Sequence, residues 1–208
     1  MTGELTPRDI VDLREYERVR GDYRRRVMAR KRRRRVPLGP IATVLFECVD
    51  TVRFQVQEMA RAERIATDEG IQQELDVYNR LLPRPGELSA TLFLELTTEG
   101  DLRTWLPRLV GIERGLAVEV GSPGEALAVV TSEPEAAHAA ALTREAVTPA
   151  VHYLRFRFDG DTARRFATEP VALAARHLEY EARTPLDEAT RAELLGDLEG
   201  RTEPLPVA

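Results

Sequence analysis

Residues 41–65, IATVLFECVDTVRFQVQEMARAERI, decide the fold of this chain because the apolar pattern changes within them. Residues 41–49 form a short, apolar and partly β-branched run, which is typical of a strand. From Thr51 to about residue 66 the apolar residues recur at helical spacing, and Asp50 or Thr51 can cap the start of that helix. This stretch therefore predicts a strand that leads directly into a helix.

The sequence on either side of this stretch predicts further helices and strands. Thr6, Pro7 and Asp9 have the spacing of a capped helix start, and helical spacing continues past Gly21 to about residue 34, as one interrupted helix or two short ones. Residues 132–147, rich in Ala and Glu, predict either a helix or a mobile insertion. After residue 66 we expect helices at about 68–82, 101–110 and 186–198. We expect strands at 88–96, 151–158 and 170–175, of which 170–175 is the last strand of the chain, and a hairpin formed by 116–120 and 126–131.

The order of these elements favours an α+β fold. Helices and strands do not alternate regularly, which favours a mostly antiparallel sheet packed with helices, followed by a C-terminal helix, over a doubly wound parallel sheet. We expect a helical, Arg-rich N-terminal arm at residues 1–35, a single α+β domain at residues 36–200, and a frayed tail at residues 201–208 that has nothing to pack against.

The composition excludes several classes of protein and site. The chain has 208 residues, 43% of them apolar and 31% charged, and no run approaches the ~20 apolar residues that cross a bilayer. The first 25 residues lack the apolar core of a secretory signal, so we expect a cytoplasmic protein without membrane association. The single cysteine excludes an internal disulfide and Cys-x-x-Cys sites, and the three histidines lack local zinc-site spacing. We therefore expect no metal and no cofactor.

The first 35 residues carry a charge opposite to that of the remaining chain. They hold thirteen of the thirty Lys and Arg residues against six acidic residues, a net charge of +7, whereas the whole chain carries −5 and residues 36–208 therefore −12. Lys31 is the only lysine, so the chain prefers Arg throughout. The densest part of the basic run is a candidate patch for an anion or an acidic partner, formed by Arg32, Arg33, Arg34 and Arg35.

Two other interpretations of this basic run stay open. The arginines can pair with the acidic body of the same chain, which would leave a solvated or self-paired face. The run at residues 24–35 is also dense enough to bind nucleic acid by releasing counterions. Its single adjoining aromatic residue, Tyr23, and the acidic body of the chain make nucleic acid the less favoured partner.

The helix at residues 51–66 is apolar on two sides, which is typical of a helix packed between two layers. Polar side chains on such a helix lose water and need partners, among which Arg is the first choice for a carboxylate. These side chains make the helix the candidate ligand-binding site. The two apolar sides are formed by Val52, Val56 and Met59 and by Phe54, Ala62 and Ile65, and the candidate ligand-binding residues are Arg53, Gln55, Gln57, Glu58, Arg61, Glu63 and Arg64.

Glu58 and Glu63 are also the candidate catalytic residues. Apolar surroundings would raise a carboxyl pKa toward neutrality, as a general base beside Arg donors requires. The two residues are five positions apart, about 140° around the helix axis, so we do not expect them to point at one site. The helix at residues 51–66 contains no histidine and so lacks the Glu-x-x-His of a di-iron helix. Structural Glu–Arg pairing and a ligand pocket that uses one of the two carboxylates remain the alternatives.

Two residues outside this helix complete the candidates from pattern alone. His152 shares the more apolar face of the strand at 151–158, where it is either a core histidine or a base or ligand-binding group. Cys48 lies at the end of the strand at 41–49, a position that predicts a buried thiol.

Several stretches of the chain resemble DUF3501, an uncharacterised bacterial family. The resemblance runs from about residue 6 to residue 198 and is carried by residues 31–40 (KRRRRVPLGP), 50–59 (DTVRFQVQEM), 61–65 (RAERI), 86–92 (GELSATL) and 151–156 (VHYLRF). Two positions depart from the family pattern: Cys48-Val49 stands where Asn-Arg is expected, and Leu178 follows His177 where the family has Pro. The polar positions that fit the family are Glu47 and those of the candidate helix, so Glu47 is also a candidate ligand-binding residue.

The resemblance implies an association rather than a mechanism. Genes of this family commonly lie beside those for rubrerythrin-like and iron–sulfur heterodisulfide-reductase-like proteins, which implies a redox or peroxide-response system and such a redox protein as partner. The leading hypothesis is therefore a cytoplasmic, cofactor-free accessory or binding protein whose central helix and basic segment hold an anionic small molecule or an acidic partner. The alternatives are an enzyme with Glu58 or Glu63 as general base, and nucleic-acid binding through residues 24–35.

Overall fold

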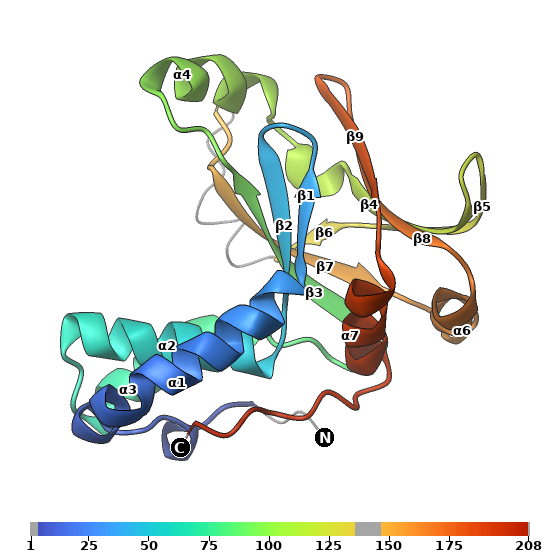
Figure 1. The fold of residues 1–208 in the computed structure, drawn as a ribbon. Coiled ribbons are helices and arrows are strands. Elements are labelled where there is room, and N and C mark those ends of the chain that lie inside the picture. The colour runs from blue at the N-terminus through green and yellow to red at the C-terminus, as the bar shows by residue number, and fades with distance from the viewer. Residues whose placement is uncertain (1–3, 136–146, 208) are drawn as a thin grey trace.

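The computed structural model describes residues 4–135 and 147–207, which form a β-rich part and a layer of helices (Figure 1). Two antiparallel sheets make up the β-rich part. Helices α1 (Leu13–Arg32), α2 (Val49–Glu63) and α3 (Asp68–Tyr78) lie together on one side of it. The α+β class, the antiparallel pairing and the C-terminal helix that the sequence predicts are confirmed.

Nine strands in the described part of the chain form the two sheets. The first sheet has the order β1-β2-β3-β7-β6 and the second the order β5-β4-β8-β9. The strands are β1 (Arg35–Leu38), β2 (Ala42–Glu47), β3 (Glu87–Leu94), β4 (Leu116–Ser122), β5 (Glu125–Thr131), β6 (Glu133–Pro134), β7 (Val151–Arg157), β8 (Val171–His177) and β9 (Tyr180–Pro185).

Three further α-helices surround the sheets: α4 (Glu99–Arg108), α6 (Gly160–Thr168) and α7 (Glu188–Leu198). Each begins at a residue whose side chain accepts a free backbone N–H of the first turn. Asp159 accepts from Thr162 at 2.7 Å in α6, and Asp187 accepts from Thr190 at 2.7 Å in α7. Such N-caps satisfy donors that have no partner inside the helix and so define where it starts. Single-turn 3₁₀-helices lie at Pro7–Asp9, Asn79–Leu81 and Ile112–Arg114.

The main core fills the space between the two sheets. Successive strand residues point to opposite faces, so alternate residues of β7 enter it. Leu154 and Phe156 are buried there, and the Phe156 ring lies 6.1 Å from that of Phe46 on β2. Val118 and Leu173 come from the second sheet. The alternation predicted for residues 151–158 is confirmed, including the inward position of His152.

Helix α2 lies between two further apolar clusters, as expected, although of the predicted second side only Phe54 is there: Ile65 packs with Val52, and Ala62 is exposed. On one side Val52 and Val56 pack with Leu75 of α3. On the other side Phe54 packs with Tyr23 of α1, with 6.0 Å between the ring centroids. The strand and helix predicted from residues 41–65 are both confirmed, as β2 and α2.

Several elements differ from the prediction. Strand β1 lies where we expected only a helix-breaking segment, and β9 and α6 lie in stretches for which no element was predicted, so β8 is not the last strand. The first long helix begins at Leu13 and not at Pro7, because Asp12 accepts the N–H groups of Arg14 and Glu15 and caps it there. The prediction for residues 132–147 falls mostly on 136–146, outside the described residues.

The turn between β1 and β2 explains why so short a strand forms. Gly39 has φ +73°, and a Cβ there would lie 2.5 Å from the Tyr180 hydroxyl. Tyr180 donates its hydroxyl to the Leu38 carbonyl, which ties the turn to β9. Glycine is the residue that combines this positive φ with such a close approach.

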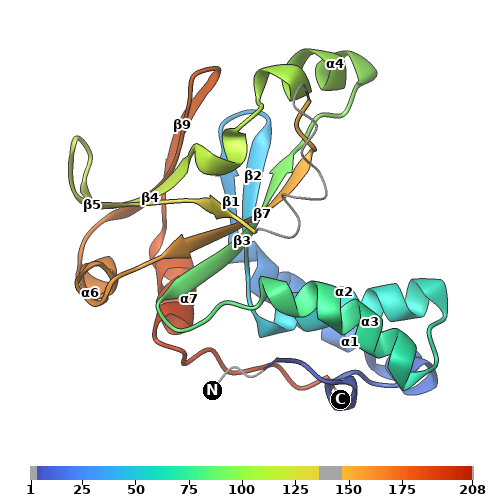
Figure 2. The same ribbon diagram turned by 180° about the vertical axis from the view of Figure 1, so that it is seen from behind.

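The C-terminal segment, residues 201–207, lies against α1 and α2, so the prediction of a frayed tail is wrong (Figures 1 and 2). Val207 is 8% exposed in the cluster that holds Phe54. The Leu205 N–H donates to Asp50 at 2.9 Å, and Arg26 donates to the Pro206 carbonyl at 2.9 Å. The sequence did not reveal these partners because they come from helices about 150 or more residues earlier in the chain.

Candidate functional site

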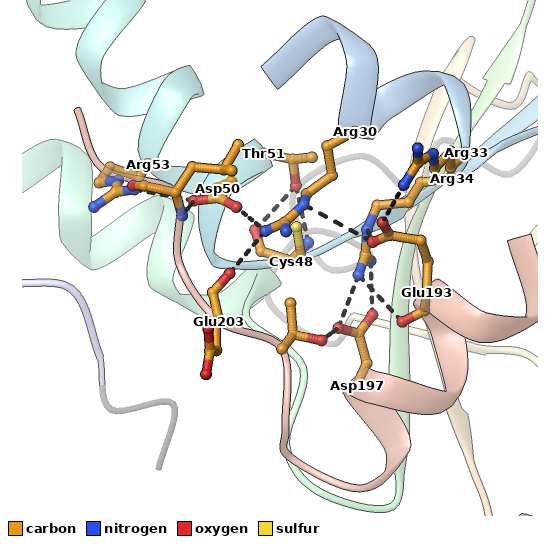
Figure 3. A network of polar contacts seen from close by, with 12 residues as sticks. Arg30, Arg33, Arg34, Cys48, Asp50, Thr51, Arg53, Glu193, Asp197 and Glu203 are labelled. Atoms are coloured by element: carbon orange, nitrogen blue, oxygen red, sulfur yellow. Dashed lines mark hydrogen bonds and ion pairs between the residues drawn. The ribbon is translucent and has the colours of Figure 1, made fainter. Parts of the chain in front are cut away.

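Arg34, one of the four consecutive arginines predicted to form an anion patch, is buried and paired inside the protein (Figure 3). Its guanidinium donates two hydrogen bonds to Asp197 of α7, at 2.6 and 2.9 Å, and a third to Glu193 at 3.3 Å. The side chains of Arg34 and Asp197 are 0% and 2% exposed. A guanidinium that is fully enclosed cannot meet a partner from outside.

The other three arginines of the patch point to different places. Arg33 lies 3.7 Å from Glu193, and Arg35 pairs with Glu95 at 3.3 Å and stacks over the Phe93 ring. Arg32 is exposed and forms no ion pair with a described residue. The prediction of one continuous anion patch at Arg32–Arg35 is therefore wrong, and pairing with the chain's own acidic side chains accounts for three of its members.

The guanidinium of Arg53, on α2, also has its hydrogen-bond partners within the protein. It donates to Asp50 at 2.9 Å and to the Tyr23 hydroxyl at 3.1 Å, and it also donates to the Leu205 carbonyl of the C-terminal segment. Gln57 pairs with the backbone of Val11, accepting its N–H at 3.0 Å and donating to its carbonyl at 2.7 Å. Both residues therefore attach the two chain termini to α2.

Glu58, the first candidate general base, is held in an ion pair. Arg20 donates to both of its oxygens, and the Tyr16 hydroxyl donates to one of them at 2.7 Å. The hydrogen bond from Arg20 is the main reason why the Glu58 pKa is lowered from its usual 4.5. The expectation of a raised pKa is therefore wrong for Glu58, and structural Glu–Arg pairing describes this residue.

The remaining polar residues of α2 lie on its outer surface. Glu63, the second candidate base, is exposed, as is Arg64, which ends the helix in the left-handed region at φ +57°. Arg61 pairs with Glu17 at 2.6 Å near the surface. Gln55 is exposed as well but borders a pocket described below. The structure does not bring the seven predicted residues of this helix to one site.

His152 is a buried histidine of the main core. Its Nε2 lies 3.2 Å from the Thr148 hydroxyl and its Nδ1 lies 4.0 Å from a Glu113 oxygen. It is 6% exposed and sits on the face of β7 opposite to the helical layer. His152 is therefore separated from Glu47 and the candidate helix by the first sheet.

A different set of polar residues gathers on the face of the first sheet that turns toward the helices. The strand register places Leu45 of β2 beside Thr91 of β3, and Thr91 beside Tyr153 of β7. The next row along the strands begins with Glu47 and Ser89. This face is unusually polar for one that is buried: Glu47, Ser89 and Thr91 are all less than 9% exposed.

A pocket of about 120 Å³ lies between this sheet face and the helices. Its polar lining consists of Lys31 from α1, Glu47 and Thr91 from the sheet, Thr51 and Gln55 from α2, Tyr78 from α3 and Tyr153 from β7. Its apolar lining consists of Leu45, Val52, Leu81, Phe93 and Val151. A concave space with apolar walls and a few converging polar groups is the usual form of a small-molecule site. We call it the Lys31 pocket.

Lys31 brings the positive charge to this pocket. Its ammonium lies 5.4 Å from the centre of the Phe54 ring and makes no hydrogen bond or ion pair within residues 4–135 and 147–207. Burial lowers the pKa of Lys31 from 10.5, and the nearby charge of Arg35 lowers it further, whereas the charge of Glu47 partly raises it. A partly desolvated ammonium without an ion pair is a group that an anion would stabilise.

Glu47 brings the negative charge. It is 7% exposed, and its Oε1 accepts a hydrogen bond of 2.5 Å from the Thr91 hydroxyl. Its Oε2 has no hydrogen-bond partner among the described residues. Glu47 and Lys31 border the same pocket but form no ion pair with each other, so their N–O distance exceeds 4.0 Å.

Sequence reasoning identified Glu47 and Gln55 as candidate ligand-binding residues but missed Lys31, Tyr78, Thr91 and Tyr153. Lys31 was noticed only as evidence of a preference for Arg. The signal that could have identified Lys31 is this preference itself. The chain uses Arg at 29 of its 30 Lys and Arg positions, so the single lysine marks a position where the compact ammonium of Lys differs in use from the planar guanidinium of Arg.

Within the described residues, no group of three or more His, Cys, Asp and Glu side chains is arranged to hold a metal ion. No helix in that part of the chain combines the length and the apolar character that crossing a membrane requires.

A family model described as protein of unknown function (DUF3501) matches residues 4–198. The chain belongs to the DUF3501 family. The resemblance seen in the sequence is confirmed.

A solved structure of a novel protein of unknown function from Burkholderia pseudomallei K96243 is similar to this DUF3501 chain in both sequence and fold. The two share 34% identity, and the match covers 94% of this chain and 100% of that one with a TM-score of 0.84. A comparison with curated proteins finds no match. The chemistry of the pocket in this DUF3501 protein therefore has to follow from its own residues.

Proposed function

We propose that this protein binds a small molecule with a compact negative group, such as a carboxylate, in the Lys31 pocket. The observation that carries the proposal is the Lys31 ammonium, which borders the pocket without an ion pair among the described residues while Glu47 stands apart from it. Nearly every other buried charge described above has a partner in direct contact.

The size and lining of the pocket limit the ligand. A volume of about 120 Å³ has room for a molecule of a few heavy atoms and not for a nucleotide or a peptide. The ammonium would donate to the negative group, and the apolar floor around Leu45 and Val52 would cover the remainder. This proposal keeps the anionic ligand expected from the sequence but moves it from the polar residues of α2 and the basic segment to the pocket between α2 and the sheet.

Two alternatives lose support. Arg34 is buried, and Arg30, Arg33 and Arg35 contact acidic side chains of the same chain, so fewer arginines of the basic run remain for nucleic acid or an acidic protein. The ion pair of Glu58 with Arg20 withdraws that carboxylate from proton transfer. The association with a redox or peroxide-response system, a redox protein as partner and a location in the cytoplasm stay predictions that rest on the family resemblance and the sequence.

Lys31→Met, with Arg32→Met as the matched control, tests the proposal. Both variants remove one cation from neighbouring positions of α1, but Arg32 is exposed and lies outside the pocket lining. Acetate, propionate and inorganic phosphate are titrated into each protein by calorimetry. We expect at least one of them to bind the unaltered protein, and Lys31→Met to weaken it by tenfold or more, since a hydrogen bond to a charged group contributes about 1.5–3 kcal/mol.

Arg32→Met should leave the affinity unchanged. The proposal fails if none of the three anions binds at millimolar concentration, or if Lys31→Met binds them as tightly as the control does. Near-ultraviolet circular dichroism of both variants establishes that each has kept its packed side chains.

A further inference from the structure

The Lys31 pocket holds a second charged group that a simple anion would leave unused. We infer that its ligand is a small zwitterion, an α-amino acid with a small apolar side chain, whose carboxylate contacts Lys31 and whose ammonium contacts Glu47. This inference rests on the proposed function and specifies the ligand class for the same site.

The first support is the state of the Glu47 carboxylate. Only its Oε1 is engaged, by Thr91, and the residue is almost completely buried. A buried carboxylate is expensive to keep charged unless hydrogen-bond donors or a cation satisfy it. Its Oε2 has no hydrogen-bond partner among the described residues and is therefore free for a donor in the pocket.

The second support is the separation of the two charges. Lys31 has a flexible side chain with four methylene groups. The negative charge of Glu47 raises the pKa of Lys31 and so opposes the lowering by burial. An ion pair between them would satisfy both, yet they stay more than 4.0 Å apart on walls contributed by α1 and β2. A cation and an anion that line the same cavity without pairing match a ligand that carries the opposite charges at its two ends.

The third support is the size and polarity of the remaining walls. An α-amino acid separates its ammonium from its carboxylate by a single carbon atom, so both charges fit within a cavity of about 120 Å³. Leu45, Val52 and Leu81 provide an apolar surface for the side chain, whereas the lining residues that the structure describes include no third formal charge. This lining favours a small apolar side chain over an acidic or basic one.

Matched ligand pairs separate this inference from the proposed function. Alanine is compared with propionate, and valine with 3-methylbutanoate, by calorimetric titration at pH 7 with the full-length protein. Within each pair the two molecules have the same carbon skeleton and carboxylate, and only the amino acid carries an ammonium. We expect at least one amino acid to bind tenfold or more tightly than its partner.

Glu47→Gln adds a second measurement. It keeps the size of the side chain and removes its negative charge, so the affinity ratio between an amino acid and its matched carboxylate should fall toward one. If the carboxylates bind as tightly as the amino acids in the unaltered protein, the zwitterion inference is overturned and the proposed function stands. If neither member of either pair binds, the zwitterion inference is overturned, and the proposed function is overturned with it unless acetate or phosphate binds. The ligand pairs decide the question in the unaltered protein even if Glu47→Gln does not fold.

Discussion

Arg20 of α1 holds Glu58 of α2 through two parallel hydrogen bonds, 2.8 Å from Nε to Oε1 and 2.7 Å from Nη2 to Oε2. Such a bidentate pair is both stronger and more specific in direction than a single hydrogen bond. Tyr16 adds a third bond from one turn earlier on α1, so the carboxylate fixes how the two helices lie against each other. The candidate base from the sequence is thus a structural contact.

Glu58→Gln should lower the free energy of unfolding by about 1 kcal/mol at pH 7, because an amide keeps the shape but loses the charge that Arg20 recognises. Glu63→Gln is the matched control on the same helix and should change it by less than about 0.5 kcal/mol, since Glu63 is exposed. Urea unfolding followed by circular dichroism measures both values.

Acid should remove the same contribution. The pKa of Glu58 is lowered in the folded protein, so its stabilising effect is fully present above 4.5 and is lost as the pH falls below that value toward the folded pKa. Unaltered protein and Glu58→Gln should therefore approach the same stability as the pH is lowered through this range. A difference between them that stays constant down to about pH 3 would show that the charge of Glu58 contributes nothing.

Arg34 gives a stronger test because its ion pair with Asp197 is fully enclosed. Arg34→Met leaves a buried carboxylate without its cation, and we expect it to cost about 3–5 kcal/mol of stability. Replacing both residues, as Arg34→Met with Asp197→Leu, should recover part of that loss because no uncompensated charge remains. Chemical denaturation compares the three proteins.

Arg33→Met is the control for this pair. Arg33 is a neighbour on the same segment, but its side chain is 64% exposed and its contact with Glu193 is long, at 3.7 Å. We expect a change below about 0.5 kcal/mol. If Arg33→Met and Arg34→Met have equal effects, burial of the Arg34–Asp197 pair is not what makes it important.

The C-terminal segment should contribute to stability through the contacts that the sequence did not reveal. Truncation after Gly200 removes the Leu205 backbone from Asp50 and Arg53 and exposes the cluster around Phe54. We expect a loss of about 2 kcal/mol, from the apolar area of two side chains and the unpaired polar groups left behind.

Two point variants separate packing from chain length. Val207→Ser should destabilise the protein because Val207 is buried, whereas Glu203→Gln should not because the Glu203 side chain is exposed and contributes only its carbonyl, to Arg30. A truncated protein as stable as the full chain would mean that the segment lies on α1 and α2 without holding them.

Local patterns predicted those elements whose own residue spacing marks the buried faces. The strand at β2, the helix at α2 and the alternation of β7 follow from residue spacing alone. β1 was missed because its pairing depends on Gly39 packing against Tyr180, 141 residues later, and no local pattern contains that contact. The same reason explains the docked C-terminal segment.

The candidate site was predicted in part for a related reason. We expected α2 to carry more polar groups than folding requires, but most of them make contacts with the termini and with α1, as Gln57 and Glu58 show. Glu47 and Gln55 were recognised, whereas Lys31 was not, because it comes close to Glu47 only when α1 packs over the first sheet. Periodicity places residues on a face of their own helix but not on the face of a distant sheet.

Cys48 should be chemically inert in the folded protein. It is 1% exposed, and burial raises the pKa of its thiol despite the nearby Arg34 guanidinium, so little reactive thiolate forms near neutral pH. A thiol reagent such as dithiobis(nitrobenzoate) should label it slowly without denaturant and rapidly in guanidinium chloride. Fast labelling of the native protein would show that the segment around Cys48 opens far more often than its packing indicates.

Binding of a simple carboxylate in the Lys31 pocket should weaken in mild alkali. The anion is held by the protonated amine, and because burial lowers the pKa of Lys31 below 10.5, the loss of affinity should begin below the pH at which an exposed lysine titrates. Below the lowered pKa the affinity should be independent of pH, and above it the affinity should fall by up to tenfold for each pH unit. Propionate is the suitable probe because it does not itself titrate in this range.

Calorimetric titrations of propionate from about pH 7 to about pH 10 measure this dependence, and Lys31→Met provides the control because it has no amine to titrate. The variant should show weak binding without an alkaline decrease. If unaltered protein and Lys31→Met lose affinity in parallel as the pH rises, another group in the protein controls the titration, and the ammonium of Lys31 does not hold the carboxylate.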